Sequence, residues 1–209
     1  MTGRIIETEA DIEEGMAHLA AICPRMAHAR DLCGPVPLRR RADGFAALLS
    51  AIVSQQLSTS AADAIWNRMQ AAGLDAPDPI RRADEADLRA AGLSRQKIRY
   101  IRALAESDLD FNVLRALPDA DVVARLTELP GIGVWTAEIY AMFSLGRADV
   151  FAPGDLALQE AARLLYDLSE RPRPRDLRQM AEPWAPWRSV AARLLWAYYR
   201  VAKQREGIR

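Results

Sequence analysis

The stretch Leu129-Pro130-Gly131-Ile132-Gly133-Val134-Trp135-Thr136-Ala137 interrupts an otherwise helical pattern. Two glycines around Ile132 predict a tight turn, because glycine tolerates turn dihedrals and lets another backbone approach. The unpaired N–H groups at the start of the next helix would form an anion site. With a helix predicted over 121–128, the segment 121–145 reads as a helix-hairpin-helix. Gly-x-Gly alone is more typical of an ordinary inter-helix turn with Ile132 in the core, but the nine-residue string is far more specific.

Helical periodicity extends outward from this hairpin in both directions. Phe45, Leu48, Leu49, Ile52 and Val53 have the spacing of one apolar helix face. The same reasoning predicts helices from Ser94, from Pro118, over 134–145, over 156–166 and over 187–203. No run of alternating β-branched residues indicates a strand. We therefore predict an all-α fold of roughly ten helices.

The formal net charge of the 209 residues is zero, with 28 basic and 28 acidic side chains. This balance excludes a histone-like blanket of positive charge, but it hides segregation. Residues 171–209 contain ten basic and three acidic residues, a net charge of +7, so the rest of the chain carries −7. The sequence therefore predicts a basic C-terminal segment and an acidic N-terminal one.

Two cysteines, Cys23 and Cys33, are too few for a disulfide framework or for a four-cysteine zinc or iron–sulfur site. Their spacing with His18 and His28 matches no zinc pattern, so buried or idle thiols are the better interpretation. The acidic N-terminus is not typical of a signal peptide, and no apolar run has the length of a membrane span. We expect a cytoplasmic monomer that associates with no membrane.

The hairpin string resembles that of the HhH-GPD superfamily of base-excision DNA glycosylases, in particular its 3-methyladenine DNA glycosylase II-like branch. Three further stretches carry the resemblance: Ser54-Gln55-Gln56-Leu57-Ser58, Val150-Phe151-Ala152-Pro153-Gly154-Asp155, and Ala181 to Ser189 followed by Trp196. The family implies a two-lobed helical fold with an active-site cleft between the lobes. We expect the glycosylase domain over 41–203, a tail over 204–209, and a helical extension over 1–40 that packs on the C-terminal lobe.

Asp155 follows Pro-Gly and precedes a predicted helix. By position alone it is typical of an N-cap, and the resemblance makes it the catalytic carboxylate; one side chain can fill both roles. Cleavage of the bond between base and deoxyribose has an oxocarbenium-like transition state. An ionised carboxylate beside the sugar would stabilise that charge and orient or deprotonate water. Alkylated bases leave with little acid assistance, which suits a site with one aspartate.

Lysine is scarce in this chain, since Lys97 and Lys203 are its only lysines. Bifunctional members of the family carry a lysine at the position of Trp135, where it forms a Schiff base and cuts the strand. Together with the missing iron–sulfur cysteines, this predicts a monofunctional glycosylase without AP lyase activity. The resemblance implies no required cofactor.

The five tryptophans are, by default, core residues, and we assign Trp66 and Trp184 to the core. The resemblance places Trp135 and Trp196 in the base pocket, where indole faces attract a flipped cationic base. Tyr140 would approach the same pocket. Ile139 stands where the family has an aromatic, which leaves the lesion range open.

Gln55 and Gln56 follow a strongly apolar helix. Either they cap its exposed carbonyls, or Gln56, with Gln55 as the alternative, is the wedge that fills the gap left by an extruded nucleotide. The resemblance also implies a monovalent cation, Na⁺ or K⁺, on the carbonyls of Thr127, Leu129 and Gly131. The residues expected to bind DNA phosphate through the hairpin are Gly131, Ile132, Gly133, Val134 and Thr136.

The sequence thus predicts a glycosylase that excises 3-methyladenine-type bases from damaged double-stranded DNA. Two alternatives stay open. One is a glycosylase of the same family for hypoxanthine, uracil or an oxidised purine. The other is a non-catalytic helix-hairpin-helix DNA-binding protein, which would bind DNA in a salt-sensitive way without releasing a base.

Overall fold

The computed structural model describes residues 3–206, with side chains as far as 204. Within this range it contains thirteen α-helices, one short 3₁₀ helix and no strand beyond an isolated bridge between Ile5 and Arg147. The prediction of an all-α fold is confirmed. No helix of the described part is long and apolar enough to cross a membrane. The helices divide into two units, residues 41–140 and residues 3–40 with 141–209, of which 207–209 fall outside the described range.

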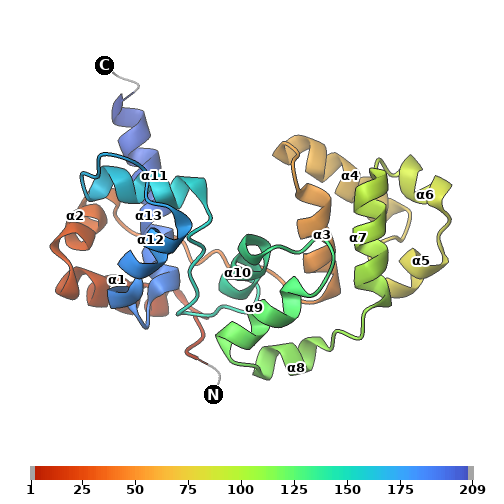
Figure 1. Cartoon of the computed structure of the whole chain (residues 1–209), viewed down its shortest axis with the longest axis horizontal. Helices are drawn as coiled ribbons and strands as arrows, with labels where there is room; N and C mark the ends of the chain where they lie inside the picture. The colour runs from red at the N-terminus through yellow and green to blue at the C-terminus, as the bar shows by residue number, and fades with distance from the viewer. Residues whose placement is uncertain (1–2, 207–209) are drawn as a thin grey trace. The chain divides into compact units, whose positions relative to one another are not determined.

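The first unit holds the complete helices α3 to α9 and the start of α10. Its central helix, α7, packs against α3, α5 and α6 (Figure 1). The buried residues of α7 are Ile98, Ile101, Leu104 and Ala105. The bounds are α3 Phe45–Ser54, α4 Thr59–Ala71, α5 Pro77–Arg82, α6 Glu85–Ala90, α7 Arg95–Glu106, α8 Phe111–Ala116 and α9 Asp119–Thr127.

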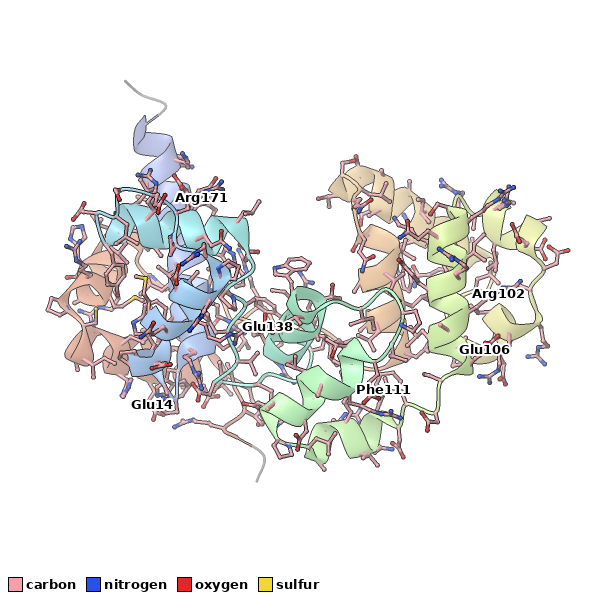
Figure 2. All side chains as sticks on the ribbon, in the orientation of Figure 1. Glu14, Arg102, Glu106, Phe111, Glu138 and Arg171 are labelled. Carbon is pink, nitrogen blue, oxygen red and sulfur yellow. The ribbon has the colours of Figure 1, made fainter. Side chains whose placement is uncertain are left out.

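Short helices account for the excess over the roughly ten expected. The helices α5, α6, α8 and α12 have six or seven residues each, too few to show an apolar period. Each begins with a local signal instead. Asp84 and Asp110 cap α6 and α8 through backbone N–H groups, and prolines open α5 and α12. Arg102 of α7, labelled in Figure 2, has a guanidinium that donates a hydrogen bond to the carbonyl of Ala83, between α5 and α6.

The second unit is built around α13, Arg188–Glu206, which packs against α1, α2 and α11. The helix α10, Val134–Phe143, runs into it from the first unit. Its remaining elements are α1 Glu9–Ile22, α2 Pro24–Cys33, α11 Leu156–Leu165, α12 Pro174–Met180 and the 3₁₀ helix η1 Glu182–Trp184.

Residues 3–40 belong to the second unit through close helix packing. A Cβ at Gly15 of α1 would lie 2.7 Å from Val190 and 2.9 Å from Trp187, so glycine sets how near α1 approaches α13. The Arg4 guanidinium lies 4.3 Å from the centroid of the Trp187 ring. Thr8 and Asp11 form a capping box that starts α1. This segment is therefore part of the core of the unit that also carries Asp155.

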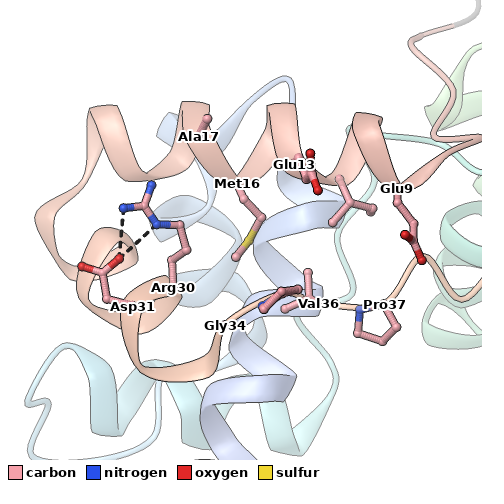
Figure 3. Close-up of a pocket in the computed structure, with 11 residues that line it drawn as sticks. Glu9, Glu13, Met16, Ala17, Arg30, Asp31, Gly34, Val36 and Pro37 are labelled. Carbon is pink, nitrogen blue, oxygen red and sulfur yellow. Dashed lines mark hydrogen bonds and ion pairs between the residues drawn. The ribbon is translucent and has the colours of Figure 1, made fainter.

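A groove of about 660 Å³ lies between α1 and the segment 34–37 (Figure 3). Met16 and Val36 line its apolar part, and the carboxylates of Glu9 and Glu13 stand along α1 at its edge. The Arg30–Asp31 ion pair, 3.0 Å between nitrogen and oxygen, closes one end. No residue predicted for catalysis or DNA binding lines this groove.

Candidate active site and nucleic-acid interface

The hairpin joins α9 to α10 in the first unit. The helix α9 ends at Thr127, the N–H of Ile132 donates to the carbonyl of Leu129 over 3.0 Å, and α10 begins at Val134. Ile132 is 4% exposed, so it anchors the turn in the core. The two helices and the turn between them therefore form the predicted helix-hairpin-helix.

The two glycines of the hairpin serve different purposes. Gly131 has φ of +89°, and a Cβ there would meet the Tyr100 ring at 2.4 Å. Gly131 is thus required by the fold itself. Gly133 has ordinary φ, is exposed, and a Cβ there would meet nothing within 4 Å. The space beside Gly133, next to the first N–H groups of α10, is open to an approaching backbone or anion.

The loop after α3 is tied to the hairpin. Gln55 Nε2 donates to the carbonyl of Gly131 over 2.7 Å, and Lys97 Nζ donates to the carbonyl of Val53 over 2.6 Å. Partial burial lowers the pKa of Lys97. Gln56, by contrast, is exposed and has φ of +57°, a left-handed conformation that costs energy outside glycine. The two glutamines therefore have different surroundings: Gln55 connects the loop after α3 to the hairpin, and the side chain of Gln56 is exposed.

The Gln55 hydrogen bond bears on the predicted cation site. Of the three expected carbonyls, that of Gly131 accepts from Gln55 and that of Leu129 accepts from Ile132. Each of these carbonyl oxygens has a second lone pair, so one hydrogen bond leaves room for a cation. The cation site stays a prediction, and no step below uses it. No group of three or more His, Cys, Asp or Glu side chains suited to a metal occurs among the described residues.

Asp155 caps α11 in the second unit. Its Oδ1 accepts hydrogen bonds from the N–H groups of Ala157, at 2.9 Å, and Leu158, at 3.1 Å. The preceding loop is fixed from within, because Gln159 Nε2 donates to the carbonyl of Pro153 over 2.8 Å. The capping role expected from position is confirmed.

A third donor reaches the same oxygen from α13. Trp196 Nε1 lies 3.1 Å from Asp155 Oδ1. The Trp196 ring is half-buried and stands 5.7 Å from the Phe143 ring, centroid to centroid, with the two planes inclined by 31°. The aspartate is thus held by donors from two helices that are remote in sequence.

The remaining residues predicted for the pocket lie on α10. Trp135 is 46% exposed, which a tryptophan seldom is, and Ile139 is half-buried. Tyr140 is buried, its hydroxyl accepts a hydrogen bond from the Gly44 N–H over 2.8 Å, and burial raises its pKa to about 12. Tyr140 therefore supports the start of α3, a structural task that the sequence did not indicate.

Among the other predicted residues, Thr136 is 8% exposed and Val134 53% exposed. Trp184 is buried against Phe151 and Tyr166, as predicted, whereas Trp66 is only half-buried. Cys23 and Cys33 form no disulfide, and Cys23 Sγ lies 3.3 Å from the hydroxyl of Tyr166.

Exposed large apolar side chains gather next to the candidate residues in the sequence. Leu57 follows Gln56, and Leu156, 64% exposed, follows Asp155. Sequence reasoning passed over both, because a leucine within a helical pattern is normally assigned to the core. Their positions in the sequence could have indicated them, because each leucine directly follows a residue that we selected as a candidate site residue.

The basic C-terminal segment is less available than its charge suggests. Arg188 forms a two-pronged ion pair with Asp149, both contacts 2.7 Å, Arg173 pairs with Asp176, and Arg193 is 3% exposed. Arg171 and Arg175 are exposed (Figure 2 labels Arg171). Arg209 lies outside the described residues. Several of the ten cations are thus committed within the protein.

The fold and hairpin define an all-helical protein of the helix-hairpin-helix class, with a capping aspartate in a Pro-Gly-Asp loop. Residues 49–186 match the family described as HhH-GPD superfamily base excision DNA repair protein. The match covers more than half of the 209 residues, so the chain belongs to that superfamily.

The chain is similar to a curated protein and to two solved structures. It is 33% identical over 171 residues to DNA-3-methyladenine glycosylase 1 of Schizosaccharomyces pombe, covering 78% of this chain and 75% of that protein. The structure of a DNA-3-methyladenine glycosidase from Bacillus halodurans has a TM-score of 0.82 and 35% identity, covering 98% of this chain and 95% of that one. The Schizosaccharomyces pombe 3-methyladenine DNA glycosylase in complex with abasic DNA has a TM-score of 0.75 and 30% identity, covering 88% and 95%.

Proposed function

We propose that this chain is a DNA glycosylase that removes alkylated bases of the 3-methyladenine type from double-stranded DNA by hydrolysis, as the first step of base-excision repair. The observation that carries the proposal is Asp155, fixed at the N-terminus of α11 by two backbone N–H groups and the Trp196 indole. Membership of the superfamily and relatives named 3-methyladenine DNA glycosylases support it.

The chemistry assigned to Asp155 is electrostatic. As the glycosidic bond breaks, positive charge develops at the sugar, and a fixed carboxylate stabilises it without reorganisation. The same carboxylate orients or deprotonates the water that attacks the sugar carbon. A cationic alkylated base leaves without a strong general acid, so one aspartate is sufficient.

The remaining roles follow from exposure and contacts. Gly133 and Val134 at the open start of α10 receive a DNA phosphate through backbone N–H groups. Gln56 projects from the loop after α3 and fills the hole left by the flipped nucleotide, while Gln55 holds that loop to the hairpin. Trp135 and Trp196 offer indole faces to the flipped base.

Strand cleavage is not part of the proposed activity. A Schiff base needs a lysine beside the sugar, and Trp135 takes the position where the bifunctional enzymes have one. Lys97 donates to Val53, and Lys203 stands 3.9 Å from Glu160. Borohydride trapping on DNA with an abasic site should give no covalent adduct; an adduct that Lys97→Gln removes would contradict this assignment.

The deciding experiment compares base release from methylated duplex DNA by wild type and Asp155→Asn. Asparagine caps a helix about as well as aspartate, so folding is preserved while the charge is lost. We expect the rate to fall roughly 100- to 1000-fold, as when other stabilising electrostatic groups are removed.

A matched control is available in Asp110→Asn. Like Asp155, Asp110 accepts hydrogen bonds from the N–H groups two and three residues further along, at 2.8 and 3.2 Å, and so caps α8. It belongs to the first unit. It should retain full activity. Parallel assays on DNA containing hypoxanthine, uracil or an oxidised purine define the lesion range. Equal rates for wild type and Asp155→Asn on methylated DNA would refute the proposal.

A further inference from the structure

Arg193 is a buried cation in the second unit. Its guanidinium donates to the carbonyl and hydroxyl of Ser189, at 2.9 and 2.6 Å, and to the carbonyls of Leu38 and Met142, at 3.3 and 3.4 Å. None of these partners is a carboxylate. Burial, with the nearby charges of Arg39 and Arg40, lowers the pKa of Arg193 to about 10. A buried charge without a counter-charge is costly, so its presence calls for a physical reason.

The guanidinium lies over an aromatic ring. Its central carbon is 4.6 Å from the centroid of Phe143, a cation–π distance. Phe143 also meets Trp196, at 5.7 Å between centroids and 31° between planes. Arg193 and Trp196 are three residues apart on α13, so both project from one face of that helix. The guanidinium and the indole therefore both contact the Phe143 ring.

The series of contacts ends at the carboxylate. The Trp196 indole N–H donates to Asp155 Oδ1 over 3.1 Å. The direction of an indole N–H follows the plane of the ring, and Phe143 limits how that plane can turn. Arg193 in turn limits where Phe143 can lie. All four residues belong to the second unit.

We propose that Arg193 is a positioning residue for Asp155, acting through Phe143 and Trp196. The inference rests on the proposed function, in which Asp155 must face a developing charge. Its physical content is that the cation fixes Phe143, Phe143 fixes the indole plane, and the indole N–H fixes one carboxylate oxygen. A role limited to holding α13 to residues 38 and 142 would account for the hydrogen bonds of Arg193, but not for its place over the ring that contacts Trp196.

Two kinds of measurement test this proposal. The first is steady-state base release. Arg193→Met and Phe143→Leu should lower kcat roughly 10- to 100-fold, the scale of a small misplacement of a reacting group. KM should rise as well, because the Trp196 indole that these side chains position is assigned to the flipped base. Phe143→Tyr, which keeps a ring in place, should restore most of kcat. The control is Arg188→Met on the same helix, whose partner Asp149 lies outside the series, and which should keep wild-type kcat.

The second measurement does not depend on activity. The indole N–H resonance of Trp196, assigned by Trp196→Phe, should shift in Asp155→Asn and also in Phe143→Leu and Arg193→Met, but not in Arg188→Met. Inactive wild-type protein would defeat the proposed function, and the resonances would still decide the positioning role. An unshifted Trp196 resonance in folded Phe143→Leu, or wild-type kcat in that variant, overturns the inference. If Arg193→Met fails to fold, the comparison of Phe143→Leu with Phe143→Tyr still tests whether the Phe143 ring positions Trp196.

Discussion

Some residues of the candidate site could be identified from the local sequence, whereas others acquire their role only through contacts that the fold creates. Asp155 in Pro-Gly-Asp before a helix is a local pattern, so both its capping role and its candidacy for catalysis could be predicted. The hydrogen bond from Trp196 spans 41 positions, and nothing in the local sequence announces it. Phe143 and Arg193 were missed for the same reason: a ring and a cation acquire their roles by packing against partners from other segments.

The exposed loop after α3 offers a prediction at the scale of one residue. Gln56 occupies a left-handed conformation that glycine adopts without strain. Gln56→Gly should therefore leave the free energy of unfolding within about 1 kcal/mol of wild type, while the gap left by the flipped nucleotide is no longer filled. We expect slower base release from a normally folded protein. Urea unfolding followed by the base-release assay measures both quantities.

The neighbouring residue is the natural comparison. Gln55→Ala removes the hydrogen bond to Gly131 and should lower stability by about 1 kcal/mol. If Gln55→Ala abolished base release and Gln56→Gly did not, the assignments of Gln55 and Gln56 would be reversed.

Among the elements, the hairpin depends on two glycines that look equivalent in the sequence. The string predicted a turn with room for another backbone, and it did not reveal which glycine serves which purpose. The structure separates them through Tyr100, a residue of α7 that a Cβ at Gly131 would meet at 2.4 Å. The helices with strong apolar periods were predicted to within a few residues. The six- and seven-residue helices were not, because fewer than two helical turns show no apolar period.

Alanine at each glycine in turn separates folding from binding. Gly131→Ala adds left-handed strain and a clash with Tyr100, and should lower the free energy of unfolding by about 2–4 kcal/mol. Gly133→Ala meets no atom within 4 Å and should leave that energy nearly unchanged. Its methyl group would occupy the open space where a DNA backbone approaches, so DNA affinity should fall. Thermal unfolding measures the effect on stability, and fluorescence anisotropy with an abasic duplex measures the effect on DNA affinity. Normal DNA affinity in Gly133→Ala would contradict a phosphate contact at this position.

At the scale of the whole molecule, zero net charge does not oppose DNA binding, because backbone N–H groups at the start of a helix can bind phosphate without formal charge. The arginines of the ion pairs Arg25–Asp167, Arg115–Asp43 and Arg188–Asp149 each already contact a carboxylate, although the sequence counts them as free positive charge. The split into +7 and −7 was read from the sequence, but the pairing of Arg188 with Asp149, which joins the two segments, required the structure. Residues 3–40 illustrate the same limit: their helices pack beside α13, far along the chain from their own position.

This arrangement predicts a shallow salt dependence. Each phosphate neutralised by a cation contributes about −0.9 to the slope of log affinity against log salt concentration. Backbone N–H groups of the hairpin bind phosphate without adding formal charge. We therefore expect a slope of about −2 to −4 on a lesion-bearing duplex, corresponding to roughly two to four neutralised phosphates.

Paired variants locate the cations responsible for that slope. Arg171 is exposed, and removing its charge in Arg171→Gln should make the slope shallower by about 0.9 if the C-terminal segment contributes a contact. Arg188→Gln removes a cation that is already bound to Asp149, so the slope should stay constant. A wild-type slope steeper than about −6 would require more free cations than the exposed arginines of residues 171–204 supply. It would place the main DNA contact on a basic surface elsewhere in the chain, because the neutral hairpin cannot produce such a dependence.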